Sequence, residues 1–127
     1  MSRNGTDRDV AKLLLDALNA IKDLVATIKS NLYSPLILTQ PVDVVGAIDD
    51  PAVYTVLAAN VSSYQWQYAY ASSPNTWVDS SLTGYDTNTL SMTITSSRYN
   101  LRFRCKITGL DGTVVYSDVV KCVAPET

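Results

Sequence analysis

Histidine is absent from the 127 residues, and only two cysteines, Cys105 and Cys122, are present. Without histidine the chain lacks the commonest metal ligand and general base, and two cysteines are too few for a disulfide framework. Charged residues are also scarce, at 17% with a net charge of −2. No basic patch with interleaved aromatic residues is present, so we expect no nucleic-acid partner.

Long apolar runs and a secretory leader are missing as well. No run approaches the roughly 20 residues that cross a bilayer, so no transmembrane segment is expected. The N-terminus, MSRNGTDRDV, lacks the apolar core and cleavage site of a signal peptide. We therefore expect the chain either to stay in the cytoplasm or to reach the outside by another route, such as assembly into a virus particle.

Catalytic patterns are equally absent. The chain contains no G-x-S-x-G motif, no P-loop and no dinucleotide-binding glycine pattern. The adjacent acids Asp49 and Asp50 precede Pro51, and two carboxylates without a third ligand seldom form a calcium site, so we interpret them as a turn. We expect neither an enzyme nor a cofactor or metal site.

The two cysteines are expected to be free thiols. If Asp111-Gly112 forms a two-residue hairpin turn, Cys105 faces Asp118 and Cys122 faces Leu101. The cysteines are then four residues out of register, about 13 Å at the rise of a strand. The Cα atoms of a disulfide lie within roughly 7 Å of each other. A bulge or a slipped register would shrink this gap, but two buried thiols fit the pattern better.

Residues Asp7 to Leu32 predict a helix, because they contain no Gly or Pro and are rich in Leu, Ala, Lys and Asp. Thr6 is expected to cap its start, with Asp9 at capping-box spacing, and Pro35 marks its end. Apolar residues along it alternate in steps of four and three, the heptad pattern of a coiled coil. This predicted oligomer interface consists of Leu14, Leu18, Ile21, Val25, Ile28 and Leu32.

A second apolar stripe widens the same face through Leu13, Ala17, Ala20 and Leu24. Because β-branched residues occupy both core registers of the heptad, a homotrimer is the favoured state. Two alternatives stay open: the helix folds back on its own domain, or it docks on another protein of an assembly. The sheets of a β-sandwich close on each other and leave no wide apolar face vacant, which speaks against folding back.

From Leu36 onward the periodicity changes from helical to alternating, so we place an oligomerisation helix at residues 1–33 and a β-domain at residues 34–127. Seven or eight short strands separated by turn residues, with no helices between them, indicate an antiparallel sandwich. The predicted strands are Leu36–Thr39, Val42–Val45, Ala52–Ala59, Ser63–Tyr70, Thr76–Asp79, Thr89–Thr95, Asn100–Thr108 and Thr113–Val123.

A family resemblance lies in the order of short motifs along this domain. They are Tyr64-Gln65-Trp66-Gln67, Thr76-Trp77, Asn88-Thr89-Leu90, Phe103-Arg104-Cys105, Gly112 and Ser117. In this order, over residues 36–123, they resemble a bacterial or phage immunoglobulin-like domain. The resemblance implies a mainly β fold, an immunoglobulin-like antiparallel β-sandwich preceded by one N-terminal helix.

The chain departs from the immunoglobulin pattern at two places. Tyr54, Val56 and Ala58 occupy the strand that would carry the partner cysteine, so no inter-sheet disulfide is expected. Phe103 stands where such domains carry a corner tyrosine, and it lacks the hydroxyl that bonds the backbone. Burial alone is therefore expected to stabilise the domain.

Aromatic residues alternate along the strand that ends at Tyr70, and we interpret Trp66 and its neighbours as core rather than as a sugar-stacking platform. The adjoining loops, 71–76 and 80–87, are rich in Ser, Asn, Thr and Tyr, which suit adaptable polar contacts. The candidate ligand residues of this region are Tyr70, Asn75, Tyr85 and Asn88.

These features favour a non-enzymatic virion surface protein: a head fibre, a capsid decoration protein or a tail accessory of a phage. Small phage virion proteins that the chain resembles combine a helical anchor with an immunoglobulin-like domain, which implies weak adhesion to cell-surface glycans strengthened by multiplicity. The expected partners are further copies of the chain, other virion proteins and such glycans. The alternative is a bacterial cell-surface or adhesin-type binding module, and an intracellular enzyme or regulator has the least support.

Overall fold

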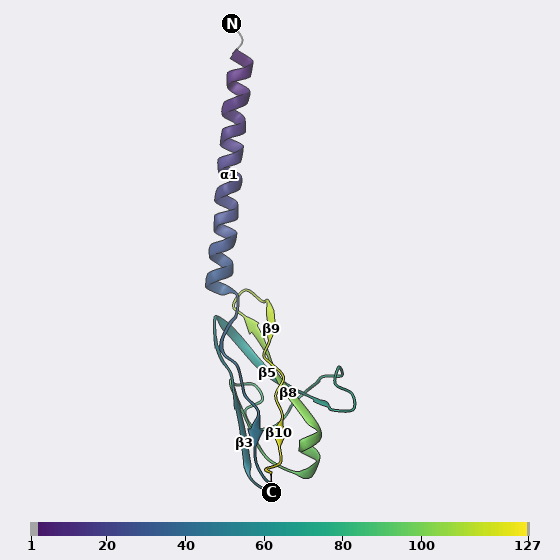
Figure 1. Cartoon of the computed structure of the whole chain (residues 1–127). Coiled ribbons are helices and arrows are strands. Elements are labelled where there is room, and N and C mark those ends of the chain that lie inside the picture. Colours follow the sequence, from purple (N-terminus) through teal and green to yellow (C-terminus); the bar gives the residue numbers. More distant parts are fainter. Residues whose placement is uncertain (1–2, 127) are drawn as a thin grey trace. The chain divides into compact units, whose positions relative to one another are not determined.

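A computed structural model describes the backbone of residues 3–126 and the side chains of residues 7–126. The chain divides into two compact units, Met1–Leu32 and Tyr33–Thr127. The first is a helix, and the second consists of short strands and one 3-10 helix (Figure 1). A mainly β chain with one N-terminal helix is therefore confirmed. Within residues 3–126, no helix is long and apolar enough to span a membrane.

Helix α1 spans Arg3–Tyr33 and starts four residues before the predicted Asp7. Thr6 lies inside it, so the predicted N-cap and capping box are wrong. Gly5 is the only breaker in this added turn, and one glycine costs about 1 kcal/mol relative to alanine, too little to stop a long helix. At the other end Pro35 disfavours the helical conformation of the residue before it, which explains the stop at Tyr33.

The strands of the second unit are short. They are β1 (Leu36–Thr39), β2 (Val44–Val45), β3 (Pro51–Thr55), β4 (Leu57–Ala59), β5 (Val61–Tyr70), β6 (Val78–Asp79), β7 (Thr89–Thr93), β8 (Leu101–Gly109), β9 (Val114–Tyr116) and β10 (Cys122–Val123), with the 3-10 helix η1 (Ser96–Asn100) before β8. Two predicted strands are interrupted, Ala52–Ala59 at Val56 and Thr113–Val123 between Tyr116 and Cys122.

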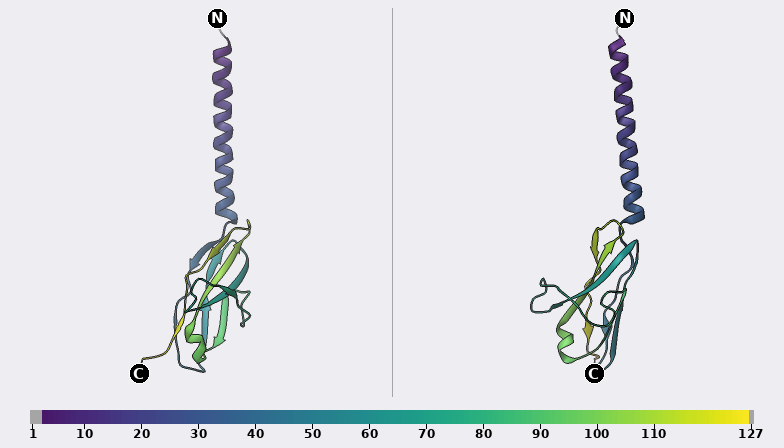
Figure 2. Two further views of the ribbon diagram at one scale, coloured as in Figure 1. Left: turned by 90° about the vertical axis from the view of Figure 1, so that its right-hand side faces the viewer. Right: turned by 180° about the vertical axis from the view of Figure 1, so that it is seen from behind.

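Four strands form an antiparallel sheet in the order β6-β5-β8-β9, and the pairs β3–β7 and β1–β4 contribute the facing layer. Strand β2 pairs in parallel with β10. Figure 2 shows β5 and β8 side by side and the segment 71–77 projecting from the domain after β5. Two antiparallel layers with this strand order are the arrangement of an immunoglobulin-like sandwich.

The core lies between the layers. Tyr54 of β3 contacts Trp66 of β5 and Phe103 of β8, with ring centroids 6.4 Å and 5.5 Å apart. All three rings are buried, so the interpretation of Trp66 as core is confirmed. The remaining fully buried large side chains are Leu90, Ile94, Ile107, Val56, Cys105 and Cys122.

Both cysteines are free and buried, as predicted, but the hairpin that carries them differs from the expected one. The Gly109 amide donates to the Thr113 carbonyl at 2.7 Å, so the turn contains the three residues 110–112 and ends in Gly112 with φ of 82°. Three-residue hairpin loops characteristically place a left-handed residue at this position. The Cys105 carbonyl consequently accepts a hydrogen bond from the Ser117 amide. Cys105 therefore lies opposite Ser117 and not opposite the predicted Asp118.

A tyrosine bonds the backbone at the corner before β8, although the predicted corner position holds Phe103. Tyr99, in η1, donates from its hydroxyl to the Gly46 carbonyl at 2.7 Å. The bond joins η1 to the segment that follows β2, residues that lie 53 positions apart in the chain. A different tyrosine therefore supplies the cross-link that Phe103 lacks.

The Tyr54 hydroxyl is the only buried side-chain polar atom without a hydrogen-bond partner among the described residues. The Cys122 thiol lies nearby, but the two groups do not meet hydrogen-bond geometry. Burial raises the pKa of Tyr54, and the Cys122 thiol raises it further. The hydroxyl therefore stays neutral and carries the desolvation penalty of an unsatisfied polar group.

We predict that Tyr54→Phe leaves the free energy of unfolding unchanged or raises it by up to about 1 kcal/mol, because only an unsatisfied hydroxyl is lost. Tyr99→Phe, the matched control, should lower the melting temperature, because it removes the bond to Gly46. Thermal and urea unfolding followed by circular dichroism measure both. A large loss of stability in Tyr54→Phe would show that the hydroxyl has a partner.

Candidate functional site

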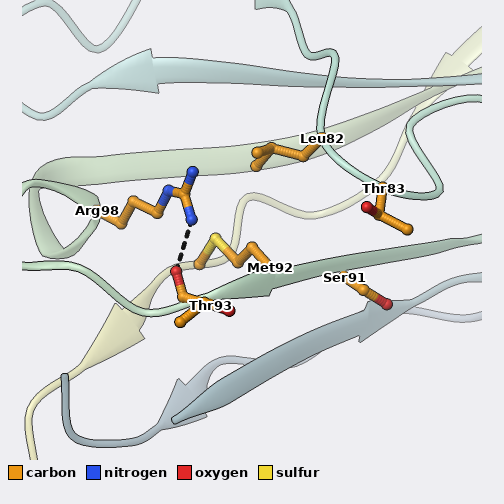
Figure 3. A pocket seen from close by; sticks show the side chains of 6 residues that line it. All are labelled: Leu82, Thr83, Ser91, Met92, Thr93 and Arg98. Atoms are coloured by element: carbon orange, nitrogen blue, oxygen red, sulfur yellow. Dashed lines mark hydrogen bonds between the residues drawn. The ribbon is translucent and has the colours of Figure 1, made fainter. Parts of the chain in front are cut away.

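A pocket of about 330 Å³ opens beside β7 and is lined by Leu82, Thr83, Ser91, Met92, Thr93 and Arg98 (Figure 3). Its position follows from the segment between β6 and β7, because the Ser91 amide of β7 donates to the Thr83 carbonyl of that segment at 2.9 Å. The Arg98 guanidinium donates from Nη1 to the Thr93 carbonyl at 2.6 Å, as the dashed line in Figure 3 marks. One cation, hydroxyls and apolar groups make up its lining.

A second pocket, of about 220 Å³, shares Leu82 and Arg98 with the first. Its other lining residues are Tyr68, Tyr70, Ser80, Ser81, Leu101 and Phe103. The rings of Tyr68 and Tyr70 meet edge to face, with centroids 6.0 Å apart. These groups offer stacking and hydrogen bonds to a ligand, but no nucleophile paired with a base.

The structure does not bring the four predicted ligand residues into one pocket. Tyr70 lines the second pocket and is 55% exposed. Asn75 lies in the projecting segment after β5, and Tyr85 is exposed between β6 and β7. The Asn88 side-chain oxygen accepts from the Thr89 hydroxyl at 3.2 Å. Of the four, only Tyr70 lines either pocket, and the ligand role of all four stays a prediction.

A different cluster lies on the outer face of the β6-β5-β8-β9 sheet. The guanidinium carbon of Arg104 is 4.3 Å from the ring centroid of Trp77 and 3.9 Å from that of Tyr116. Its Nε donates to the Gln67 side-chain oxygen at 2.9 Å, and the Gln67 amide nitrogen donates to Asp79 at 2.9 Å. The arginine is therefore held between two aromatic rings and oriented by an amide that is itself anchored.

Sequence reasoning missed this cluster, although one signal for it was present. Arg102, Arg104 and Lys106 alternate along β8 with the buried residues Phe103 and Cys105, which places the three cations on one outer face. The alternation could have marked β8 as a cationic strand. The contact with Trp77 and Tyr116 depends on strand pairing that local patterns do not specify.

Metal and nucleophile chemistry receive no support from the described residues. No three His, Cys, Asp or Glu side chains among them gather at one point. Asp50 accepts from the Ala47 amide at 3.0 Å and Asp49 has φ of 77°, so the acidic pair forms a turn. Burial raises the pKa of Cys105 to about 12 and also raises that of Cys122. Neither thiol is activated as a nucleophile.

No protein-family profile and no curated protein sequence matches the chain. Among solved structures, it is similar to Duf (Kirre) D1 at 14% identity and a TM-score of 0.46, covering 73% of this chain and 100% of that one. It is also similar to the titin M10–obscurin-like 1 Ig complex at 15% identity and a TM-score of 0.41, covering 75% of this chain and 99% of that one. With such scores these likenesses do not extend to a function.

We predict that neither cysteine reacts within minutes with a thiol reagent at pH 8 in the native protein. Raised pKa values keep both side chains protonated at that pH, and both are buried. In guanidinium chloride two thiols per chain should react at once. Fast labelling of the native protein, followed by absorbance, would contradict this account.

Proposed function

We propose that this chain is a non-enzymatic building block of a larger assembly, in which helix α1 self-associates and the β-sandwich is the displayed recognition domain. The observation that carries the proposal is the exposed seam of the helix. Its six predicted interface residues are each 45–67% exposed in the single chain, and they are Leu14, Leu18, Ile21, Val25, Ile28 and Leu32. An apolar stripe of this length needs a covering partner.

Further copies of the same helix are the partner that fits the seam. The heptad spacing lets each core residue meet its own equivalent in a parallel bundle. One core register holds Leu18, Val25 and Leu32 and the other holds Leu14, Ile21 and Ile28, so β-branched residues occur in both registers, which favours a trimer. A flank with Ala and Leu at residues 17 and 24 widens the face beyond what a two-stranded seam covers.

The expected strength of this association is moderate. Full burial of a Leu, Ile or Val side chain contributes about 1.5–3 kcal/mol. Because the six seam residues are about half exposed in the single helix, covering them contributes on the order of 5–10 kcal/mol per chain. Lost rotational and translational freedom costs about 4–15 kcal/mol. We therefore expect a reversible, concentration-dependent oligomer that a surrounding assembly would strengthen.

The setting we propose is the surface of a phage virion, as a head fibre, capsid decoration or tail accessory. Support comes from the order of immunoglobulin-like motifs in the domain and from the benefit of multiplicity. A domain that binds cell-surface glycans weakly gains avidity when many copies are held together. The guanidinium of Arg104, with the rings of Trp77 and Tyr116 beside it, offers such a domain both polar and apolar contacts for a sugar.

Light scattering of the intact protein at micromolar concentration should give about three times the 13.8 kDa mass of one chain. Ile21→Asp and Val25→Asp should return it to a monomer with an unchanged melting temperature of the sandwich, because a charge at the seam cannot be buried unpaired. Ala26→Asp, outside both apolar stripes of the helix, is the matched control and should remain oligomeric. A wild-type monomer would refute self-association, and a dimer would refute the trimer.

If the chain is part of a phage virion, as proposed, genes for a major capsid or tail protein should flank its gene. Their products would supply the shell or tail on which the helix bundle is carried. Sequencing of the genomic neighbourhood is the test. A neighbouring sortase, or a parent gene with a secretion signal, would contradict the virion setting and favour the bacterial adhesin.

A further inference from the structure

The outer face of the β6-β5-β8-β9 sheet is positively charged in a domain that is acidic overall. Between residues 33 and 127 the sequence contains five Lys and Arg against eight Asp and Glu. Three of the five cations, Arg102, Arg104 and Lys106, follow one another at alternate positions of β8. Their neighbours in the strand point into the core, so the three share the outer face.

Arg104 is the best oriented of the three. Its guanidinium carbon lies 4.3 Å from the ring centroid of Trp77 and 3.9 Å from that of Tyr116, and its Nε donates to Gln67. Within the described part of the chain, its two Nη groups have no hydrogen-bond partner and no carboxylate forms an ion pair with it. Asp79, the nearest acid in this network, accepts from Gln67 instead. The edge of the guanidinium that carries the two Nη groups is therefore free to bind a ligand.

We propose that this surface binds a sugar carboxylate, so that the ligand of the displayed domain is an acidic glycan. This inference rests on the proposed glycan-binding function and names its ligand class. A guanidinium takes a carboxylate through two parallel hydrogen bonds, and one whose rotamer is already fixed loses little entropy on binding.

The aromatic flanks identify a sugar rather than an acidic peptide as the occupant. Trp77 is half-buried and Tyr116 is 47% exposed, so ring surface remains beside the guanidinium. Such rings combine apolar area with a polar edge, which suits the mixed C–H and hydroxyl surface of a pyranose. Arg102 and Lys106, along the same strand, extend the positive field to a further acidic unit of the glycan.

The test is an NMR titration of the full-length ¹⁵N-labelled protein with a glucuronate-containing hyaluronan tetrasaccharide. Its methyl ester is the neutral probe of equal shape, and a tetraglutamate peptide is the acidic probe without a sugar. The acid sugar should shift the Trp77 indole and the Arg104 amide signals. It should bind at least about tenfold more tightly than its ester, the value of one charged hydrogen-bond pair.

Variants locate the site. Arg104→Gln should weaken binding of the acid sugar at least about tenfold. Arg104→Lys should weaken it less, because lysine keeps the positive charge but lacks the paired N–H donors of a guanidinium. Arg98→Gln removes the same charge from the two pockets and should leave the affinity unchanged. The comparison of acid with ester in the wild-type protein holds even where a variant fails to fold.

Each remaining outcome overturns the proposal in a distinguishable way. Equal binding of acid and ester, or loss of binding in Arg98→Gln, would remove the Arg104 site but keep glycan binding. Tighter binding of tetraglutamate would replace the sugar by an acidic peptide. If no sugar binds, the glycan part of the proposed function fails as well, whereas the self-association of the helix is measured separately by light scattering.

Discussion

The indole of Trp66 has to be buried and hydrogen-bonded at once, and much of the domain is arranged around that requirement. Its Nε1 donates to the Thr87 carbonyl at 2.8 Å. Its backbone amide donates to the Tyr85 carbonyl, and its own carbonyl accepts from the Ser80 amide. The segment between β6 and β7 is thereby bonded to β5 at several points. Because that segment also supplies Leu82, the bonds of Trp66 position the lining that the two pockets share.

The same strand pairing that builds the core also builds the outer face. Cys105 lies opposite Trp66 in the β5–β8 pair, and Arg104 lies opposite Gln67 one position away. Alternation sends the first pair inward and the second outward. Burial without a disulfide is sufficient for the inner side, whereas the outer side is organised by stacking and by charged hydrogen bonds. Core and candidate binding surface are thus consequences of one register.

The helix follows a different physical rule from the sandwich. The sandwich buries its apolar residues within one chain, but α1 exposes every described side chain from residue 7 to residue 33. Isolated helices are marginally stable, so packing of the apolar stripe has to supply most of the stability. Under the proposed self-association, the stability of α1 rises with protein concentration, whereas that of the sandwich does not.

What the sequence alone determines are properties that depend on local periodicity. The heptad spacing, the strand alternation, the absence of an inter-sheet disulfide and the burial of Trp66 all follow from which residue types recur at which interval. Local patterns were less reliable at the ends of elements, such as the start of α1 before Thr6 and the three-residue turn at Gly112.

Only the tertiary structure decided which distant residues meet. Trp77, Arg104 and Tyr116 come from three separate segments, and their contact depends on the β5–β6, β5–β8 and β8–β9 registers together. Tyr99, rather than the residue at the expected corner, reaches Gly46 because of the path of η1. Periodicity specifies which way a side chain faces, whereas contact between segments depends on the register and crossing of strands that the sequence specifies only through the whole fold.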